Sequence, residues 1–238
     1  MHSYNIDFVN EVDSTNTYLK SRIKQGVVKQ PYAVSAGSQY AGKGQRGKDW
    51  ESKPHQNILV SLLVSDPGDV ASLSWLNHAA ALSVVDVLTK MGVKNSAIKW
   101  PNDVYVGERK IAGILTENIV SDKRVRYAVI GIGLNVNQRR FEEYKATSIS
   151  LITGEEHNTV DVLHYLYDSF YQRITENSSS LLEEVNAKLY KLGKNVTFER
   201  DNRMEEYQIS GIHSSGNLLV KNREDIIQLE HHKVKWIH

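Results

Sequence analysis

The stretch from Gly42 to Trp50, which reads Gly-Lys-Gly-Gln-Arg-Gly-Lys-Asp-Trp, constrains the fold of this chain most. Its glycine spacing matches the dinucleotide-binding motif G-x-G-x-x-G and the P-loop motif G-x-x-x-x-G-K, and both motifs require a helix directly afterwards. Pro54 disfavours helix at Lys53, and no apolar period of 3.6 residues begins there. Asp49 also stands where a P-loop has its magnesium-binding Ser or Thr. Neither nucleotide-binding fold fits.

Two interpretations of this stretch remain. Its three glycines and three cations predict a mobile cationic lid that closes over an anionic ligand through side chains and backbone N–H groups. The alternative is a solvated basic turn without a ligand.

The composition is that of a globular protein without a dominant charge. The chain has 238 residues, of which 40% are hydrophobic and 24% charged, and its formal net charge is +1. This charge gives no field that would attract nucleic acid or an anionic membrane. The chain has no cysteine, which excludes a disulfide scaffold and a thiolate nucleophile. No signal-peptide core or apolar membrane span is present, so we expect a cytoplasmic protein.

Apolar periodicity and turn residues predict two structural units. Strands are expected at residues 5–9, 32–37, 57–65, 97–100, 104–106, 109–120 and 125–136. Helices are expected at residues 17–25, 70–91, 159–175 and 180–192. Gly107 and Glu108 predict a tight hairpin turn just before Lys110. Beyond Leu192, short alternating strands at a spacing of about 8–12 residues predict a small β-barrel.

Several polar and glycine residues have both a structural and a functional interpretation. Residues 13–16 favour a helix N-cap, and the same helix start could hold a polar ligand group. Glycines at Gly131 and Gly133 indicate a close approach to the strand backbone or a β-bulge. Lys99 and Lys110 fit a binding site or a solvated strand surface, whereas Trp100 is expected in the core.

Five segments, taken in their order and spacing, resemble biotin protein ligases. They are Ser14-Thr15-Asn16, Gln39 with the lid, Lys99-Trp100-Pro101-Asn102-Asp103, Arg109-Lys110-Ile111-Ala112-Gly113 and Gly131-Ile132-Gly133-Leu134-Asn135. The resemblance implies an α+β fold of the biotinyl/lipoyl transferase type, similar to class II synthetases, with a mixed sheet flanked by helices. It implies a catalytic domain that binds biotin and ATP at residues 1–192 and an SH3-like β-barrel at residues 193–238.

The resemblance also implies a reaction. A biotin–[acetyl-CoA-carboxylase] ligase activates biotin with ATP and magnesium as biotinyl-AMP, and then transfers biotin to a lysine of a biotin carboxyl carrier protein. Fixed cations would stabilise the charge that develops on phosphate and carboxylate oxygens. Two alternatives stay open, a lipoate–protein ligase on the same fold and a non-catalytic biotin-binding module.

Site roles follow from the same resemblance, position by position. The ureido end of biotin would contact Ser14, Thr15, Asn16 and Gln39, and room for its rings would be left by Gly113, Gly131 and Gly133. Lys110 would bind the carboxylate and the α-phosphate, and it would act catalytically together with Arg46. The lid residues that would hold the adenylate are Gly42, Lys43, Gly44, Gln45 and Arg46, with Trp50 packed against it. Asn135 would contact adenine, Lys99 and Asn102 the phosphates, and Asp103 the Mg²⁺ ion.

Two features depart from the commonest pattern of that family. The lid reads Gly42-Lys43-Gly44-Gln45 where Gly-Arg-Gly-Arg is commonest, so the bidentate guanidinium groups are replaced by one ammonium and one amide. Only 13 residues precede Ser14, too few for the helix-turn-helix domain of family members that are also repressors. We therefore expect no DNA binding and no membrane partner; a homodimer is left open.

Overall fold

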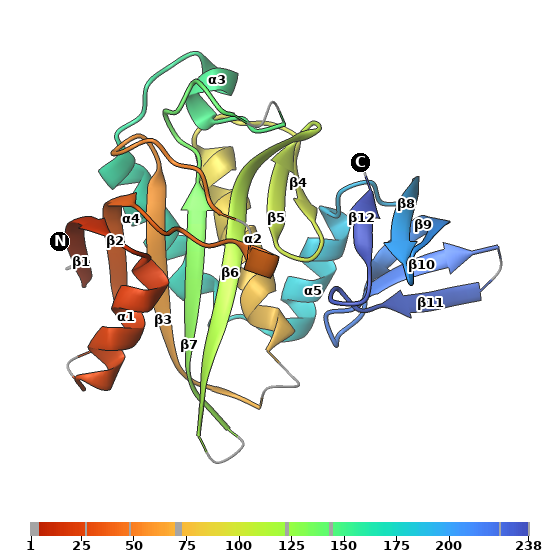
Figure 1. Cartoon of the computed structure of the whole chain (residues 1–238), viewed down its shortest axis with the longest axis horizontal. Helices are drawn as coiled ribbons and strands as arrows, with labels where there is room; N and C mark the ends of the chain where they lie inside the picture. The colour runs from red at the N-terminus through yellow and green to blue at the C-terminus, as the bar shows by residue number, and fades with distance from the viewer. Residues whose placement is uncertain are drawn as a thin grey trace.

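The computed structural model describes residues 5–26, 28–47, 49–69, 73–121, 124–142, 145–223 and 225–237, with residue 46 described by its backbone alone. The strands of the larger sheet are β1 Ile6–Val12, β2 Ala33–Gln39, β3 Ile58–Gly68, β4 Ser96–Lys99, β5 Asp103–Val106, β6 Arg109–Ser121 and β7 Arg124–Leu134. Their spatial order is β1-β2-β3-β7-β6-β5-β4 (Figure 1). β1 and β2 are parallel and the other neighbours antiparallel, which confirms the predicted mixed sheet.

Helices cover the two faces of this sheet unequally. They are α1 Thr15–Lys24, α2 Ser74–Lys90, α3 Ile149–Thr153, α4 Thr159–Arg173 and α5 Ser178–Ala187. Neighbouring residues of β3 point to opposite faces of the sheet. Leu62 packs with α2 and α4 in the main core, whereas Leu63 packs with α1 in a smaller cluster. Figure 1 shows α1 in front of the sheet and α2 behind it. The front face is therefore covered only in part, and the site described below lies there.

The ends of all four predicted helices differ from the sequence prediction, α4 only by ending at Arg173, two residues early. The first helix begins at Thr15, two residues earlier than predicted. Asp69 was expected to cap the second, but its N-cap is Leu73; residues 70–72 of that prediction lie outside the described part of the chain. The last helix was expected to reach Leu192, yet it ends at Ala187. The physical reason is a competing strand pairing with the free edge of β4, because the carbonyl of Lys188 accepts from the N–H of Ile98 and the N–H of Tyr190 donates to the carbonyl of Ile98.

A second, five-stranded antiparallel sheet follows α5. Its strands are β8 Asn195–Arg200, β9 Arg203–Ile212, β10 Leu218–Asn222, β11 Asp225–Leu229 and β12 Lys235–Ile237, in the order β11-β10-β9-β8-β12. It matches the predicted SH3-like unit. The indole of Trp100 donates a hydrogen bond to the carbonyl of Gly216 at 2.8 Å, and Asn186 of α5 bonds the backbone of Ile212. The small sheet therefore docks on the segment that follows β4.

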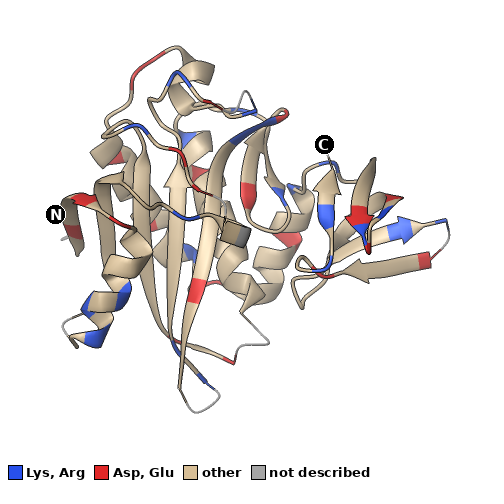
Figure 2. Cartoon of the chain, viewed as in Figure 1, with Lys and Arg blue, Asp and Glu red and all other residues tan. Residues whose placement is uncertain are grey.

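Residues of both charge signs are interspersed along the helices and strands of both sheets (Figure 2). No helix in the part of the chain that the structure describes is long and apolar enough to cross a membrane.

Arg173 on α4 ties the three rear helices together. Its guanidinium binds Asp86 of α2 through two hydrogen bonds of 2.9 Å each, and it also contacts Glu176 at 3.1 Å and Glu184 of α5 at 2.8 Å. The Arg173 side chain is only 15% exposed, so solvent screens these contacts weakly.

Arg173→Met is expected to lower the free energy of unfolding by about 2 kcal/mol, because it leaves three carboxylates without their shared cation. Thermal denaturation followed by circular dichroism measures this loss. Arg126→Met is the matched control, since the Arg126–Asp66 pair is 3.7 Å long and exposed and should contribute under about 0.5 kcal/mol. Equal melting temperatures for the two variants would contradict the prediction.

Candidate active site

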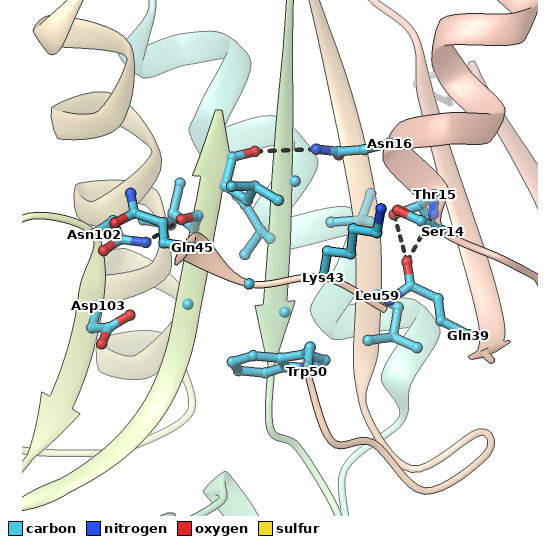
Figure 3. Close-up of a pocket in the computed structure, with 18 of the residues that line it drawn as sticks. Ser14, Thr15, Asn16, Gln39, Lys43, Gln45, Trp50, Leu59, Asn102 and Asp103 are labelled. Atoms are coloured by element: carbon cyan, nitrogen blue, oxygen red, sulfur yellow. Dashed lines mark hydrogen bonds between the residues drawn. The ribbon is translucent and has the colours of Figure 1, made fainter. Parts of the chain in front are cut away.

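A pocket on the front face of the large sheet collects most of the predicted site residues (Figure 3). Those that line it are Ser14, Thr15, Asn16, Gln39, Lys43, Gly44, Gln45, Trp50, Asn102, Asp103, Lys110, Gly113, Gly131 and Gly133. They come from the start of α1, the end of β2, the lid and strands β5, β6 and β7. The fold thus joins segments from the whole first half of the sequence.

One end of the pocket is a hydrogen-bonded polar cluster at the start of α1. Ser14 is the N-cap residue, but its side chain makes no capping bond. The backbone N–H of Thr15 instead donates to Gln39 Oε1 at 2.8 Å, and the Thr15 hydroxyl donates to the same oxygen at 3.1 Å. Ser61 on β3 lies beneath, with its Oγ 2.8 Å from Thr15 Oγ1 and 2.5 Å from Asn16 Oδ1. This end can exchange hydrogen bonds with a small polar group.

The glycines of β6 and β7 allow other side chains to approach the strand backbone closely. The pairing register of the two strands continues through these glycines without a bulge. A Cβ on Gly131 would lie 2.5 Å from Asn16 Oδ1. A Cβ on Gly133 would lie 2.3 Å from the Trp50 indole, and one on its cross-strand partner Gly113 would lie 2.9 Å from the same ring. The predicted close approach to the strand backbone is confirmed. In this structure the approaching groups are the side chains of Asn16 and Trp50.

The other end of the pocket carries an ion pair. The Nζ of Lys110 lies 2.7 Å from Asp103 Oδ1 and 5.3 Å from the centre of the Trp50 ring. The predicted hairpin is confirmed, since Gly107 has a φ of 59° and Val106 pairs with Arg109. Lys110 is also fixed on its other side, because its N–H donates to the carbonyl of Lys145 at 2.8 Å and its carbonyl accepts from Thr147 at 2.9 Å. The ammonium therefore extends from a rigid backbone.

The lid lies over the pocket between these two ends (Figure 3). The backbone of Lys43 forms an isolated antiparallel β-bridge with that of Asp49, and the Trp50 N–H donates to the carbonyl of Gly42 at 3.0 Å. Residues Gln45–Gly47 form a short 3-10 turn. Gly42 is buried beneath this closure and does not line the pocket. Lys48 and the side chain of Arg46 lie outside the described residues. Among the residues that are described, the lid is followed by no α-helix before β3, as predicted.

Two further predicted residues do not line the pocket. Asn135 lies one residue beyond the end of β7 and is buried, and its amide donates to the carbonyl of Thr147 at 3.0 Å. Lys99 lies in β4 at the sheet edge, with its Nζ 4.7 Å from the centre of the Tyr105 ring and 5.0 Å from that of Trp236. Burial lowers the pKa of Lys99 to about 8, although the charge of Asp103 opposes this shift.

Sequence reasoning missed the apolar floor of the pocket. Its side chains are Leu59 and Leu115; Val60, Ile114 and Ile132 also border the pocket, but their side chains pack in the main core on the other face of the sheet. Their strands were predicted, but alternation alone does not say which buried residues border a ligand. Asn102 lines the pocket, yet its amide already donates to the carbonyl of Ile114.

Asp103 is the carboxylate that could hold a magnesium ion in this pocket. Within the described ranges, no group of three His, Cys, Asp or Glu side chains could hold a metal on its own. Magnesium is commonly bound by one or two carboxylates together with substrate phosphates, and Asp103 fits that mode.

Comparison with known proteins identifies the family. The model of the biotin/lipoate A/B protein ligase family matches residues 8–135, more than half of the chain. The chain belongs to this family. The bifunctional ligase/repressor BirA of Escherichia coli is 38% identical over 132 residues, which are 56% of this chain and 40% of that protein. The biotin–[acetyl-CoA-carboxylase] ligase of Mycobacterium tuberculosis is 34% identical over 153 residues, 62% of this chain and 54% of that protein.

Solved structures of the family resemble the entire fold. The biotin protein ligase of Aquifex aeolicus in complex with biotin and ATP has a TM-score of 0.82 and 26% sequence identity, and the match covers 98% of both chains. In the sequence comparisons, by contrast, this chain spans between 40% and 62% of the first relatives matched. The structural match includes the small C-terminal sheet as well as the pocket.

Proposed function

We propose that this chain is an ATP-dependent ligase that joins biotin to AMP and then transfers biotin to a lysine of a biotin carboxyl carrier protein. The observation that carries the proposal is the pocket itself, in which a polar hydrogen-bonding cluster at Thr15, Asn16 and Gln39 faces an apolar floor and ends at the Lys110–Asp103 pair. Biotin has the same order of groups, a cyclic urea, an apolar ring and chain, and a carboxylate.

The cation of Lys110 supports the activation step. Biotin carboxylate and the α-phosphate of ATP are both anionic, so bringing them together in one pocket is electrostatically unfavourable. A fixed ammonium between them reduces this repulsion and stabilises the charge that builds on the phosphate as the carboxylate oxygen attacks. The C–O–P anhydride forms, and pyrophosphate leaves with the electron pair of the broken P–O bond.

The lid supports retention of the adenylate. Lys43 and Gln45 line the pocket from above, and the hydrogen bond from Trp50 to Gly42 closes the loop. A closed lid excludes water that would hydrolyse the mixed anhydride. Bound Mg²⁺, held by Asp103 and the phosphates, would neutralise the charge of the leaving pyrophosphate.

The second step needs a carrier lysine whose amine is neutral. That amine attacks the carbonyl carbon of the adenylate, an amide forms, and AMP leaves. The relatives from Mycobacterium tuberculosis and Paracoccus denitrificans both carry the name biotin–[acetyl-CoA-carboxylase] ligase, which states a carboxylase as their substrate. We propose the biotin-accepting domain of a carboxylase as the partner.

Mass spectrometry of a biotin-accepting carrier domain tests this function. The domain is incubated with the chain, ATP, magnesium and either biotin or lipoate. We expect one added biotinyl group and no lipoyl group. A gain of lipoyl alone would overturn the choice of substrate, and pyrophosphate release without any labelled carrier would reject the transfer step.

The pKa of Lys99, lowered to about 8 by burial, leads to a pH dependence of ATP binding. The charge that Lys99 contributes to the phosphate site is nearly complete at pH 7 and is lost as the pH rises through about 8. The KM for ATP should therefore rise about tenfold between pH 7 and pH 9, while the KM for biotin stays nearly constant.

Lys99→Arg supplies the control for this pH profile. A guanidinium remains charged throughout this range, so the ATP profile of the variant should be flat. Steady-state pyrophosphate release gives both constants. The same rise in the arginine variant would show that another group causes it.

A further inference from the structure

Glu117 lies on β6 next to the polar end of the pocket but does not line it. Its Oε1 accepts from Lys20 Nζ of α1 at 2.8 Å, and its Oε2 accepts from Asn16 Nδ2 at 2.8 Å. The three side chains come from two segments about one hundred residues apart in sequence, α1 and β6, and they meet where α1 packs on the sheet. Glu117 thus contacts one of the predicted ligand-binding residues directly.

These contacts decide which way the Asn16 amide points. Burial by itself would raise the pKa of Glu117, but the hydrogen bonds from Lys20 and Asn16 outweigh it and hold the pKa below its usual value. An ionised carboxylate only accepts hydrogen bonds. The carbonyl of Leu115, 3.3 Å from Asn16 Nδ2, is also only an acceptor. Both protons of the Asn16 amide are therefore engaged by acceptors of β6, and Figure 3 shows the bond to Leu115.

The orientation of Asn16 then fixes the polarity of the cluster. Asn16 Oδ1 accepts from the Ser61 hydroxyl and lies against Gly131, so one of its two lone pairs is left for a ligand donor. Gln39 is oriented in the same manner, because its Oε1 accepts from Thr15 and its Nε2 is left to donate. A fixed acceptor beside a fixed donor complements a cyclic urea, in which an N–H donor lies next to a C=O acceptor.

We propose that Glu117 is a positioning residue that locks the Asn16 amide with its oxygen toward the ligand, and so determines recognition of the cyclic urea. The proposal rests on the proposed function, since it takes biotin as the ligand of this pocket. Glu117 acts through Asn16 and contacts no reacting atom. Its effect should therefore appear in the binding of biotin and not in the binding of ATP.

The first test is a KM comparison by pyrophosphate release. Glu117→Leu removes the charged acceptor and should raise the KM for biotin at least about tenfold, the effect of losing one hydrogen bond to a charged group. The KM for ATP should stay within about twofold of wild type. Glu117→Gln should lie between, because its amide oxygen can still accept. Glu199→Leu is the matched control, since Glu199 is a strand glutamate of β8 with similar exposure and an ion pair to Lys235.

The second test exchanges the carboxylate and the amide between positions 117 and 16. It remains informative if Glu117→Leu fails to fold. Asn16→Asp places a carboxylate against Glu117 and should raise the KM for biotin strongly. Adding Glu117→Gln supplies an N–H donor to that carboxylate, and the double variant should recover at least about threefold of the loss. A merely structural role for Glu117 predicts that the two losses add.

The outcomes separate this proposal from the proposed function. Wild-type protein that releases no pyrophosphate with biotin would reject both. Active wild type, together with a folded Glu117→Leu variant whose KM for biotin is unchanged, would reject only the positioning role. Parallel rises in both KM values with a lowered melting temperature would also reject it, because they indicate general damage to the fold.

Discussion

Lys110→Ala is expected to slow adenylate formation by at least about 100-fold at saturating biotin and ATP, the effect of removing one charge-stabilising donor. The backbone of Lys110 is fixed by β5 on one side and by residues 145–147 on the other. Truncation of its side chain should leave that backbone in place and remove only the ammonium that we propose lies between the two reacting anions. Pyrophosphate release under saturation measures the chemical step, since uniform binding losses are then suppressed.

Two further variants make this measurement specific. Lys110→Arg should restore part of the rate, because it keeps the charge while the guanidinium is larger and planar. Arg109→Ala is the control, since Arg109 is the exposed neighbour on the same strand. Circular dichroism confirms folding. A folded Lys110→Ala protein that turns over within about threefold of wild type would remove Lys110 from the mechanism.

Gly131→Ala is expected to raise the KM for biotin by about 30-fold, with a smaller effect on the KM for ATP. The new Cβ would lie 2.5 Å from Asn16 Oδ1, and Asn16 cannot move aside easily because Glu117, Leu115 and Ser61 all hold it. Overpacking of this kind costs about 1–3 kcal/mol, which corresponds to about 5- to 150-fold in an equilibrium constant.

The same substitution in an Asn16→Ala background tests the cause. Asn16→Ala removes the three atoms that lie nearest to the added methyl group, so Gly131→Ala should have little further effect on the KM for biotin. Equal effects in both backgrounds would show that the methyl group acts elsewhere, for example by blocking the ligand itself.

The sequence was sufficient for the strands of the sheet and for the local turn that presents Lys110. The alternation of apolar residues over β3, β6 and β7 and the tight turn at Gly107 depend only on neighbouring residues, so the sequence alone predicts them. The helix ends were predicted less well. Residues 188–190 leave the helical pattern because β4 offers an edge to pair with, and no short-range pattern reports an edge that lies about ninety residues earlier in the chain.

The site shows the same division between local and distant information. Gly131 and Gly133 face the pocket because they share one face of β7, but Asn135 has the same parity and still turns inward, since the strand ends at Leu134. Lys99 lies one strand further out than Asp103, with which it pairs across β4 and β5. Glu117 gave no signal at all, because its importance depends on α1 crossing β6 in space.

The position of Trp50 gives the pocket an intrinsic spectroscopic reporter. The chain has four tryptophans, and Trp50 is the one that lines the pocket, with its indole against Gly113 and Gly133. Trp75, Trp100 and Trp236 pack in or against the main core instead. A ligand that enters must contact or displace the Trp50 ring, so ligand occupancy can be followed by intrinsic fluorescence without a label. The signal that disappears in Trp50→Phe belongs to the pocket, and the remaining emission serves as an internal reference.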